Sequence, residues 1–353
     1  MRAMIVKEFR ELARDRRTLA MLIVLPLLLL VVFGYAANFY VSSVKAAVTG
    51  PLATQVEQSL PDYFDVTITE PGYDRTQAEN LVRDNKVDVA IVTTNPGTPA
   101  VALVDGSNLF AAQSTVSVLN KVGDSVQTDV LFNPELKTSW VMVPAIIGLI
   151  LTFIGTIITS IGLVREREAG TLEQLAVMPI RPSQVILGKI VPYFLLAALD
   201  MIVVTGLGML LFGVPFNGNV LVFALGAAIF LFVVLGLGVL ISTVSQTTGQ
   251  AIQLAFLFLM PQILLSGMIF PLDAMAAGVR WIGYLLPLTY FTMISQGVML
   301  RGAPIATLWL PLLILTVMAV VVFTGATLRF RRDLAPNVKP RNARTDDTDM
   351  AAQ

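Results

Sequence analysis

Few side chains in this sequence could carry out chemistry, because it contains neither histidine nor cysteine. Disulfides, thiolate chemistry, imidazole metal sites and histidine catalysis are therefore excluded, and we predict no catalytic residue and no metal site. The sequence also has no Gly-x-x-x-x-Gly-Lys-Ser/Thr loop for nucleotide phosphates. The remaining candidates are three glutamates in one polar segment, and isolated hydroxyls, amides and one carboxylate within apolar stretches.

Residues 165–189 form the most specific polar segment, and they include Glu166, Glu168 and Glu173. Thr171 and Gln174 have the spacing of a capping box, so they predict a short helix. Two apolar helices need only about four to six residues to connect them, and this segment is far longer. We expect an amphipathic helix lying across the ends of two apolar helices; a solvated surface helix is the alternative.

The polar residues inside the apolar stretches form one clear pattern. Thr152, Thr156, Thr159 and Ser160 fall on one face of a helix. Hydroxyl stripes of this kind join helices, within a chain or across a dimer seam, and they can also line a substrate path. The same two readings apply to three further residues: Gln253, Gln262 and Ser266.

Asp200 is the one carboxylate deep within an apolar stretch. Insertion scales put the cost of such a residue in lipid at roughly 2.5–3.5 kcal/mol, so it should face protein or water. A structural hydrogen bond and a substrate or proton role both remain open.

The elements that must position these residues are membrane helices. Hydrophobic residues make up 55% of the sequence, charged residues only 14%, and mean hydropathy is +0.75. Since about 20 apolar residues cross a bilayer, the fold class is a polytopic α-helical membrane protein with six transmembrane helices. The expected spans are 19–40, 140–164, 190–212, 220–243, 251–270 and 308–328.

Charge sets the expected orientation. Basic residues cluster before the first span, in segment 165–189 and after the last span, which places both termini in the cytoplasm. Residues 41–139 hold six basic and twelve acidic residues and are expected outside. We expect the first span to stay as an anchor, because it exceeds the apolar length of a signal peptide.

Residues 1–18 are expected to form an amphipathic helix at the cytoplasmic membrane surface; an ordinary basic flank is the alternative. The residues that carry this pattern include Lys7, Phe9, Arg10 and Arg14.

The segment 41–139 is expected to be an extracytoplasmic α/β domain. Alternating apolar residues predict strands at 64–68, 87–91 and 100–104, with 44–48 as a further candidate. A capping box beginning at Thr76 predicts a helix to about Asp84, and helical periodicity predicts a second helix over 107–131.

Residues 271–304 are too apolar for a solvated loop, so we expect two short re-entrant helices in the outer leaflet; an amphipathic surface loop is the alternative. The tail 333–353 is expected to be disordered and cytoplasmic.

Several motifs together resemble bacterial type-2 permeases of the ATP-binding-cassette transporter superfamily. The strongest is Arg167-Glu-Ala-Gly-Thr-Leu-Glu-Gln-Leu175 followed by Pro179-Ile180. Supporting motifs are Lys7-Glu8-Phe9, Val104-Asp105-Gly106-Ser107-Asn108, Phe132-Asn133-Pro134-Glu135, Ser266-Gly267-Met268-Ile269-Phe270-Pro271 and Leu286-Pro287-Leu288-Thr289-Tyr290-Phe291. Two departures are Gln296, where many relatives have arginine, and Ala276-Ala277, where a proline is common.

The resemblance implies a half-transporter that pairs with a second permease, as a homodimer or a heterodimer, and with separate cytoplasmic ATPase subunits. ATP and Mg²⁺ would be bound by those ATPases, and this chain would bind no cofactor. The coupling residues that the resemblance implies are Glu166, Glu168, Gly170, Thr171, Leu172, Glu173 and Gln174. Other expected partners are membrane lipid and a small-molecule substrate, with a periplasmic adaptor left open; no nucleic acid is expected.

The leading functional hypothesis is ATP-driven export of an amphipathic or hydrophobic compound through the bacterial plasma membrane. One alternative is ATPase-driven mechanotransmission to a periplasmic partner without substrate crossing the membrane. Another is an ion-coupled secondary carrier, which predicts internal repeats and several buried charges, and neither is evident.

Overall fold

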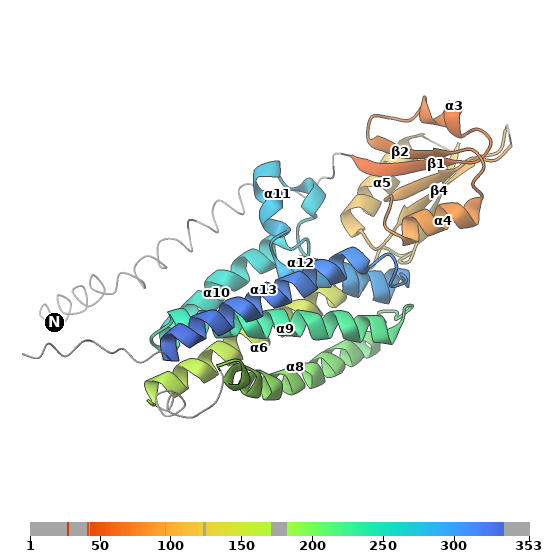
Figure 1. The fold of residues 1–353 in the computed structure, drawn as a ribbon. Helices are drawn as coiled ribbons and strands as arrows, with labels where there is room; N and C mark the ends of the chain where they lie inside the picture. The colour runs from red at the N-terminus through yellow and green to blue at the C-terminus, as the bar shows by residue number, and fades with distance from the viewer. Residues whose placement is uncertain are drawn as a thin grey trace, which may run out of the picture.

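The computed structural model describes residues 27, 41, 43–95, 97–122, 125–170 and 182–334. It consists of a bundle of long helices with a small α/β sheet domain at one end (Figure 1). We call this end of the bundle the sheet end and the opposite end the far end. The predicted interfacial helix, with Lys7, Phe9, Arg10 and Arg14, lies outside the described residues, as does almost all of the predicted first span.

Within the described residues, five helices are long and apolar enough to cross a membrane. They are α6 (Thr138–Glu168), α8 (Pro182–Phe212), α9 (Val220–Val244), α10 (Thr248–Leu265) and α13 (Trp309–Leu334). These helices confirm the second to sixth predicted spans, whereas the total of six stays a prediction. The fifth span was predicted to reach Phe270, but α10 ends at Leu265 because the chain bends and Gly267 takes a φ of +86°.

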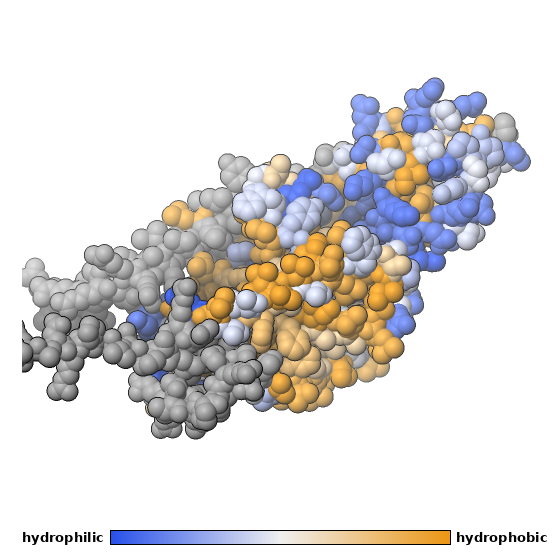
Figure 2. Space-filling model, in the orientation of Figure 1, coloured by the Kyte–Doolittle hydropathy of each residue, from blue (hydrophilic) through white to orange (hydrophobic). Residues whose placement is uncertain are grey.

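The outer surface of the bundle is apolar. On the face seen in Figure 2, apolar residues cover the coloured part of the helices, while polar residues gather over the sheet domain. On α8, for example, Leu195, Ile202 and Leu210 are 64%, 64% and 82% exposed. An apolar surface of this extent is typical of a protein surrounded by lipid.

The sheet domain contains five strands in the order β2-β1-β3-β4-β5. The strands are β1 (Val44–Thr49), β2 (Phe64–Glu70), β3 (Val89–Val92), β4 (Ala100–Asp105) and β5 (Val126–Leu131). Strand β3 pairs antiparallel with β4, and the other neighbours pair in parallel. All four predicted strands are present, although the predicted strand 87–91 begins two residues later.

Helices cover both faces of this sheet. They are α3 (Ala53–Glu57), α4 (Arg75–Arg83) and α5 (Leu109–Val122). Ile91 points to the face that also buries Leu119 of α5, and the next residue, Val92, points to the face that buries Val82 of α4. This alternation follows from the two-residue period of a strand, and it gives the domain two separate apolar cores.

Two local predictions in the sheet domain were wrong. The helix α4 is capped by Asp74, whose side chain accepts from the amide of Gln77 while the Gln77 side chain accepts from the amide of Asp74. The predicted cap at Thr76 is therefore two residues late. The predicted single helix over 107–131 is instead α5 followed by β5, because Val126, Thr128 and Val130 alternate with polar residues and favour a strand.

Residues 271–304 were predicted to form two short helices, and the structure has two short α-helices with one further helical turn beside each. They are η1 (Leu272–Ala274), α11 (Ala277–Gly283), α12 (Pro287–Gln296) and the π-helical turn η2 (Gly297–Arg301). Helix α12 is buried in the bundle core, where Phe291 stacks on Phe230 of α9 with ring centroids 4.5 Å apart. Their re-entry into a bilayer from one side stays a prediction.

Helices α6 and α9 approach closely at Gly238. A Cβ atom at this position would lie 2.8 Å from Thr159 Cβ and 2.9 Å from the carbonyl oxygen of Thr156. Small residues commonly allow such contacts between membrane helices. This contact fixes the distance between the two central helices of the bundle.

We therefore expect Gly238→Ala to separate α6 from α9 and to destabilise the protein by about 1–3 kcal/mol, the usual cost of overpacking. Thermal unfolding of the detergent-solubilised protein, followed by circular dichroism, measures the effect. Gly206→Ala on α8 is the matched control, because a Cβ there meets no atom within 4 Å. Equal melting temperatures for the two variants would contradict the close approach.

Candidate functional site at the far end of the bundle

The last turn of α6 carries an arginine that binds the end of α9. Arg167 Nη1 donates hydrogen bonds to the carbonyl oxygens of Ser242 at 3.0 Å and Ser245 at 2.7 Å. The last carbonyls of a helix lack partners within the helix, and the partial negative charge there favours a cation. Arg167 therefore caps the C-terminal end of α9.

The next residue, Glu168, binds the beginning of α10. Its carboxylate accepts hydrogen bonds from the Thr248 amide at 2.9 Å and from Thr248 Oγ1 at 2.8 Å. The first amides of a helix lack internal partners, and a carboxylate is favoured there. The positive side chain of Arg167 thus meets the C-terminal end of α9, and the negative side chain of Glu168 meets the N-terminal start of α10.

We call Arg167 and Glu168, with their contacts to residues 242–248, the far-end clamp. It holds the turn between α9 and α10 against α6, so these three helices must move together at this end. The chain leaves the clamp through Gly170, whose φ is +71°, and enters segment 171–181. The clamp therefore lies within the predicted coupling segment 165–189, directly before residues 171–181.

The predicted coupling residues divide between these two regions. Glu166 is half-buried on α6, and Glu168 and Gly170 are exposed. Thr171, Leu172, Glu173 and Gln174 lie outside the described residues. Contact of all seven with an ATPase stays a prediction, but the Glu168 carboxylate is already engaged within the chain.

Arg167 and Thr248 were missed as functional residues by sequence reasoning. A usable signal was present, since every helix end leaves carbonyls that need donors and every helix start leaves amides that need acceptors. The sequence does not state, however, that the turn at 245–247 would lie beside Arg167.

The predicted hydroxyl stripe lies inside the chain. Thr152, Thr156, Thr159 and Ser160 are all buried, and Thr156 and Thr159 border the close approach at Gly238. Thr152 Oγ1 donates to the Gly148 carbonyl at 2.7 Å, a bond within α6. These contacts favour helix packing over an exposed dimer seam or substrate path for this stripe.

The other predicted polar residues do not form one site. Gln262 is buried, and its Oε1 accepts from the Leu288 amide at 3.2 Å, which joins α10 to α12. Ser266 is also buried, whereas Gln253 is exposed on α10. Asp200 on α8 is half-buried, and among the described residues its Oδ2 has no hydrogen-bond partner.

The described part of the chain holds no group of three or more acidic side chains that could bind a metal ion. The bonds found at the far end join helices, and none of them places a nucleophile beside a base. What this arrangement can do is transmit motion between elements.

Comparison with known proteins gives a family match over most of the sequence. The family model described as "ABC-2 family transporter protein" matches residues 16–328. Two similar Escherichia coli K12 proteins are the probable multidrug ABC transporter permeases YbhR and YbhS, each 29% identical to this chain. The YbhR alignment covers 93% of this chain and 97% of YbhR, and the YbhS alignment covers 94% and 97%.

A third relative aligns over a shorter region at higher identity. The inner membrane transport permease YhhJ of Escherichia coli K12 is 36% identical over 216 residues, which is 60% of this chain and 56% of YhhJ.

The far-end clamp predicts that Arg167→Gln will free the α9–α10 turn. Backbone amides of residues 244–250 should then exchange hydrogen on the order of ten-fold faster, because a charged hydrogen-bond donor is lost. Hydrogen-exchange mass spectrometry of the full chain measures this rate. Arg165→Gln removes the same charge from an exposed position two residues earlier and should leave the rate unchanged; equal acceleration in both variants would argue against the clamp.

Proposed function

This chain belongs to the ABC-2 family of transporter proteins, and from that premise we propose that it is the membrane subunit of an ATP-driven exporter. It is a multi-pass membrane protein of the permease type. The exported compound is amphipathic or hydrophobic, such as a drug, an antibiotic or a lipid-like molecule. The names of YbhR and YbhS, which describe those proteins as probable multidrug permeases, support this substrate class.

The nucleotide site belongs to a partner chain. We assign ATP and Mg²⁺ to separate cytoplasmic ATPase subunits, and the lack of a Gly-x-x-x-x-Gly-Lys-Ser/Thr loop in these residues supports that assignment. A second permease completes the membrane part of the transporter. Both termini, segment 165–189 and hence the far end of the bundle are cytoplasmic, and the sheet domain is extracytoplasmic.

The observation that carries this proposal is the position of the far-end clamp. Segment 171–181 begins three residues after Glu168, where α6, α9 and α10 are joined by Arg167 and Glu168. If an ATPase displaces this segment, α6, α9 and α10 are displaced together. If the three helices were not joined here, only the helices directly connected to the segment would move.

The membrane part suits a compound that enters from lipid. The exposed faces of the helices are apolar, and the bundle interior offers isolated amides and hydroxyls, such as Gln262 and Ser266. Asp200, whose Oδ2 has no hydrogen-bond partner among the residues that the structure describes, is available for a polar group of the substrate or for a hydrogen bond that forms during the cycle. A strongly charged solute would find few complementary charges in such an interior.

A second candidate function is mechanotransmission, in which the ATPase moves the sheet domain to act on an extracytoplasmic partner. The observation in its favour is a buried arginine, Arg301, that joins the bundle to the sheet domain. The family membership counts against an ion-coupled secondary carrier.

Reconstitution with the cognate ATP-binding-cassette ATPase in proteoliposomes tests the proposal. We expect the permease to stimulate ATP hydrolysis, amphipathic dyes to stimulate it further, and the dye to move out of the compartment that contains ATP. Hydrolysis by the purified permease alone would contradict it, and so would an active complex that moves none of these dyes.

Glu173→Lys should prevent co-purification with the ATPase and abolish dye transport, because it reverses a charge in the predicted coupling helix. Glu70→Lys is the matched control, since Glu70 is an exposed glutamate of the sheet domain. A Glu173→Lys variant that kept full ATPase binding and transport would remove Glu173 from the coupling assignment.

A further inference from the structure

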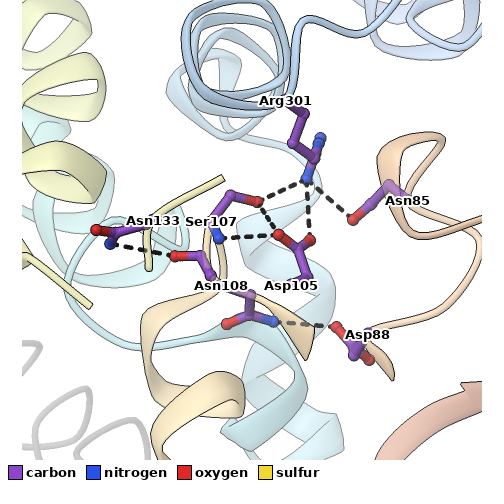
Figure 3. Close-up of polar contacts among 8 residues, drawn as sticks. Asn85, Asp88, Asp105, Ser107, Asn108, Asn133 and Arg301 are labelled. Carbon is purple, nitrogen blue, oxygen red and sulfur yellow. Dashed lines mark hydrogen bonds and ion pairs between the residues drawn. The ribbon is translucent and has the colours of Figure 1, made fainter. Parts of the chain in front are cut away.

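Arg301 is a buried positive charge where the bundle meets the sheet domain (Figure 3). Its side chain is only 9% exposed, and Nη1 lies 3.6 Å from Asp105 Oδ2, whose side chain is 1% exposed. The same nitrogen donates to Ser107 Oγ at 3.2 Å and to Asn85 Oδ1 at 3.1 Å. One side chain of the bundle thus contacts two separate segments of the sheet domain.

The sheet domain holds Asp105 in place for this contact. Its second oxygen, Oδ1, accepts from the Ser107 amide at 2.8 Å and from Ser107 Oγ at 2.6 Å. The Asp105 amide donates to the Asp88 carbonyl at 2.9 Å. Burial, and then the charge of nearby Asp105, raise the pKa of Asp88.

Hydrogen bonds within the bundle also fix the backbone at Arg301. Arg301 ends the π-helical turn η2, and Gly302 follows it with a left-handed φ of +62°. Asn217, in the connection between α8 and α9, donates from its amide to the Met299 carbonyl at 3.0 Å and from Nδ2 to the Leu300 carbonyl at 2.8 Å. The arginine is therefore fixed relative to the sheet end of the bundle.

Helix α12 connects Arg301 to α6. Ser295 Oγ donates to the Pro144 carbonyl at 3.2 Å, and Gln296 Nε2 donates to the Val141 carbonyl at 3.0 Å. The side-chain amide of Gln296 thus reaches the backbone of α6 directly. A shift of the sheet end of α6 is thus passed to the last turn of α12, directly before η2.

Helix α6 itself extends from this point to the far-end clamp without interruption. It has 31 residues, which corresponds to roughly 45 Å at 1.5 Å per residue. One helix therefore carries the far-end clamp at one end and, through α12, reaches Arg301 at the other.

We propose that Arg301 is a positioning residue that couples the sheet domain to α6, so that the domain moves whenever the bundle responds to its ATPase. The inference rests on the proposed function and adds to it a route to the extracytoplasmic side. Contacts between domains within a chain usually permit relative motion. A buried ion pair supported by hydrogen bonds limits independent motion of the sheet domain and the bundle. A displacement of either part therefore displaces the other.

The reciprocal consequence is that a ligand bound to the sheet domain changes the ATPase. Any molecule that shifts Asp105 relative to the bundle shifts α12 and α6 with it. This applies whether the domain guides an exported compound or acts on a partner.

The test uses hydrogen exchange of the complete permease–ATPase complex in lipid nanodiscs, without nucleotide and with ATP plus vanadate. Two regions are followed: amides 244–250 report the far-end clamp, and amides 102–108 report the sheet domain beside Arg301. In the wild-type complex we expect the nucleotide to change exchange in both regions. In Arg301→Gln the far-end change should remain, whereas the change at 102–108 should fall to the level of replicate error.

Two control variants separate coupling from general damage. Arg301→Lys keeps the charge and should retain the response at 102–108. Arg280→Gln removes a nearby arginine whose bonds are local, to the carbonyls of Asp273 and Met275, and should also retain it. In the absence of nucleotide, exchange in β1 and β3 should be the same in all variants, which excludes unfolding of the domain.

A sheet response that persists in Arg301→Gln would overturn the coupling role of Arg301, as would a wild-type far-end response without a sheet response. If neither region of the wild-type complex responded to nucleotide, the proposed function would fail first, and this inference with it.

Discussion

Two adjacent opposite charges at the end of one helix are the interaction on which the rest of this structure depends. Arg167 meets the carbonyl end of α9, and Glu168 meets the amide start of α10, so each charge faces the helix pole that favours it. Reversing their order would place each charge beside the wrong pole. Because α6 carries both, the three helices form one mechanical unit at the far end, beside the segment that we assign to the ATPase.

Packing inside the bundle then determines which other helices move with α6, α9 and α10. Close contact of α6 with α9 at Gly238, and the Phe230–Phe291 stack between α9 and α12, leave little space for one helix to slide past another. Polar bonds between α12 and the backbone of α6 extend the same unit to the sheet end. Dense packing supplies stiffness, and a few directed hydrogen bonds determine which helices move together.

Much of this architecture could be predicted from the sequence, for physical reasons that differ by element. Long apolar stretches identified five of the helices, since lipid demands about 20 apolar residues for each. Strand β5 was missed because Leu109, Ala112, Val116 and Leu119 set a helical period that was wrongly extended past residue 122. Within the candidate site, Glu168 was predicted only as an ATPase-coupling residue, which stays a prediction, and neither its bonds to Thr248 nor the role of Arg167 was predicted. The pair formed by Arg301 and Asp105 could not be predicted, because the two residues are far apart in the sequence and neither belongs to a repeating pattern.

The central claim is that this membrane chain is moved by a separate ATPase that grips segment 171–181. The absence of cysteine from the sequence permits a direct measurement, since Glu173→Cys would introduce the only thiol of this sequence. A photoactivatable cross-linker attached there, in the assembled complex in native membranes, is predicted to capture the ATP-binding-cassette ATPase subunit, and to do so less efficiently from an Asp62→Cys control in the sheet domain. Capture of lipid alone from position 173, or modification of this cysteine by a membrane-impermeant reagent added outside intact cells, would contradict the account.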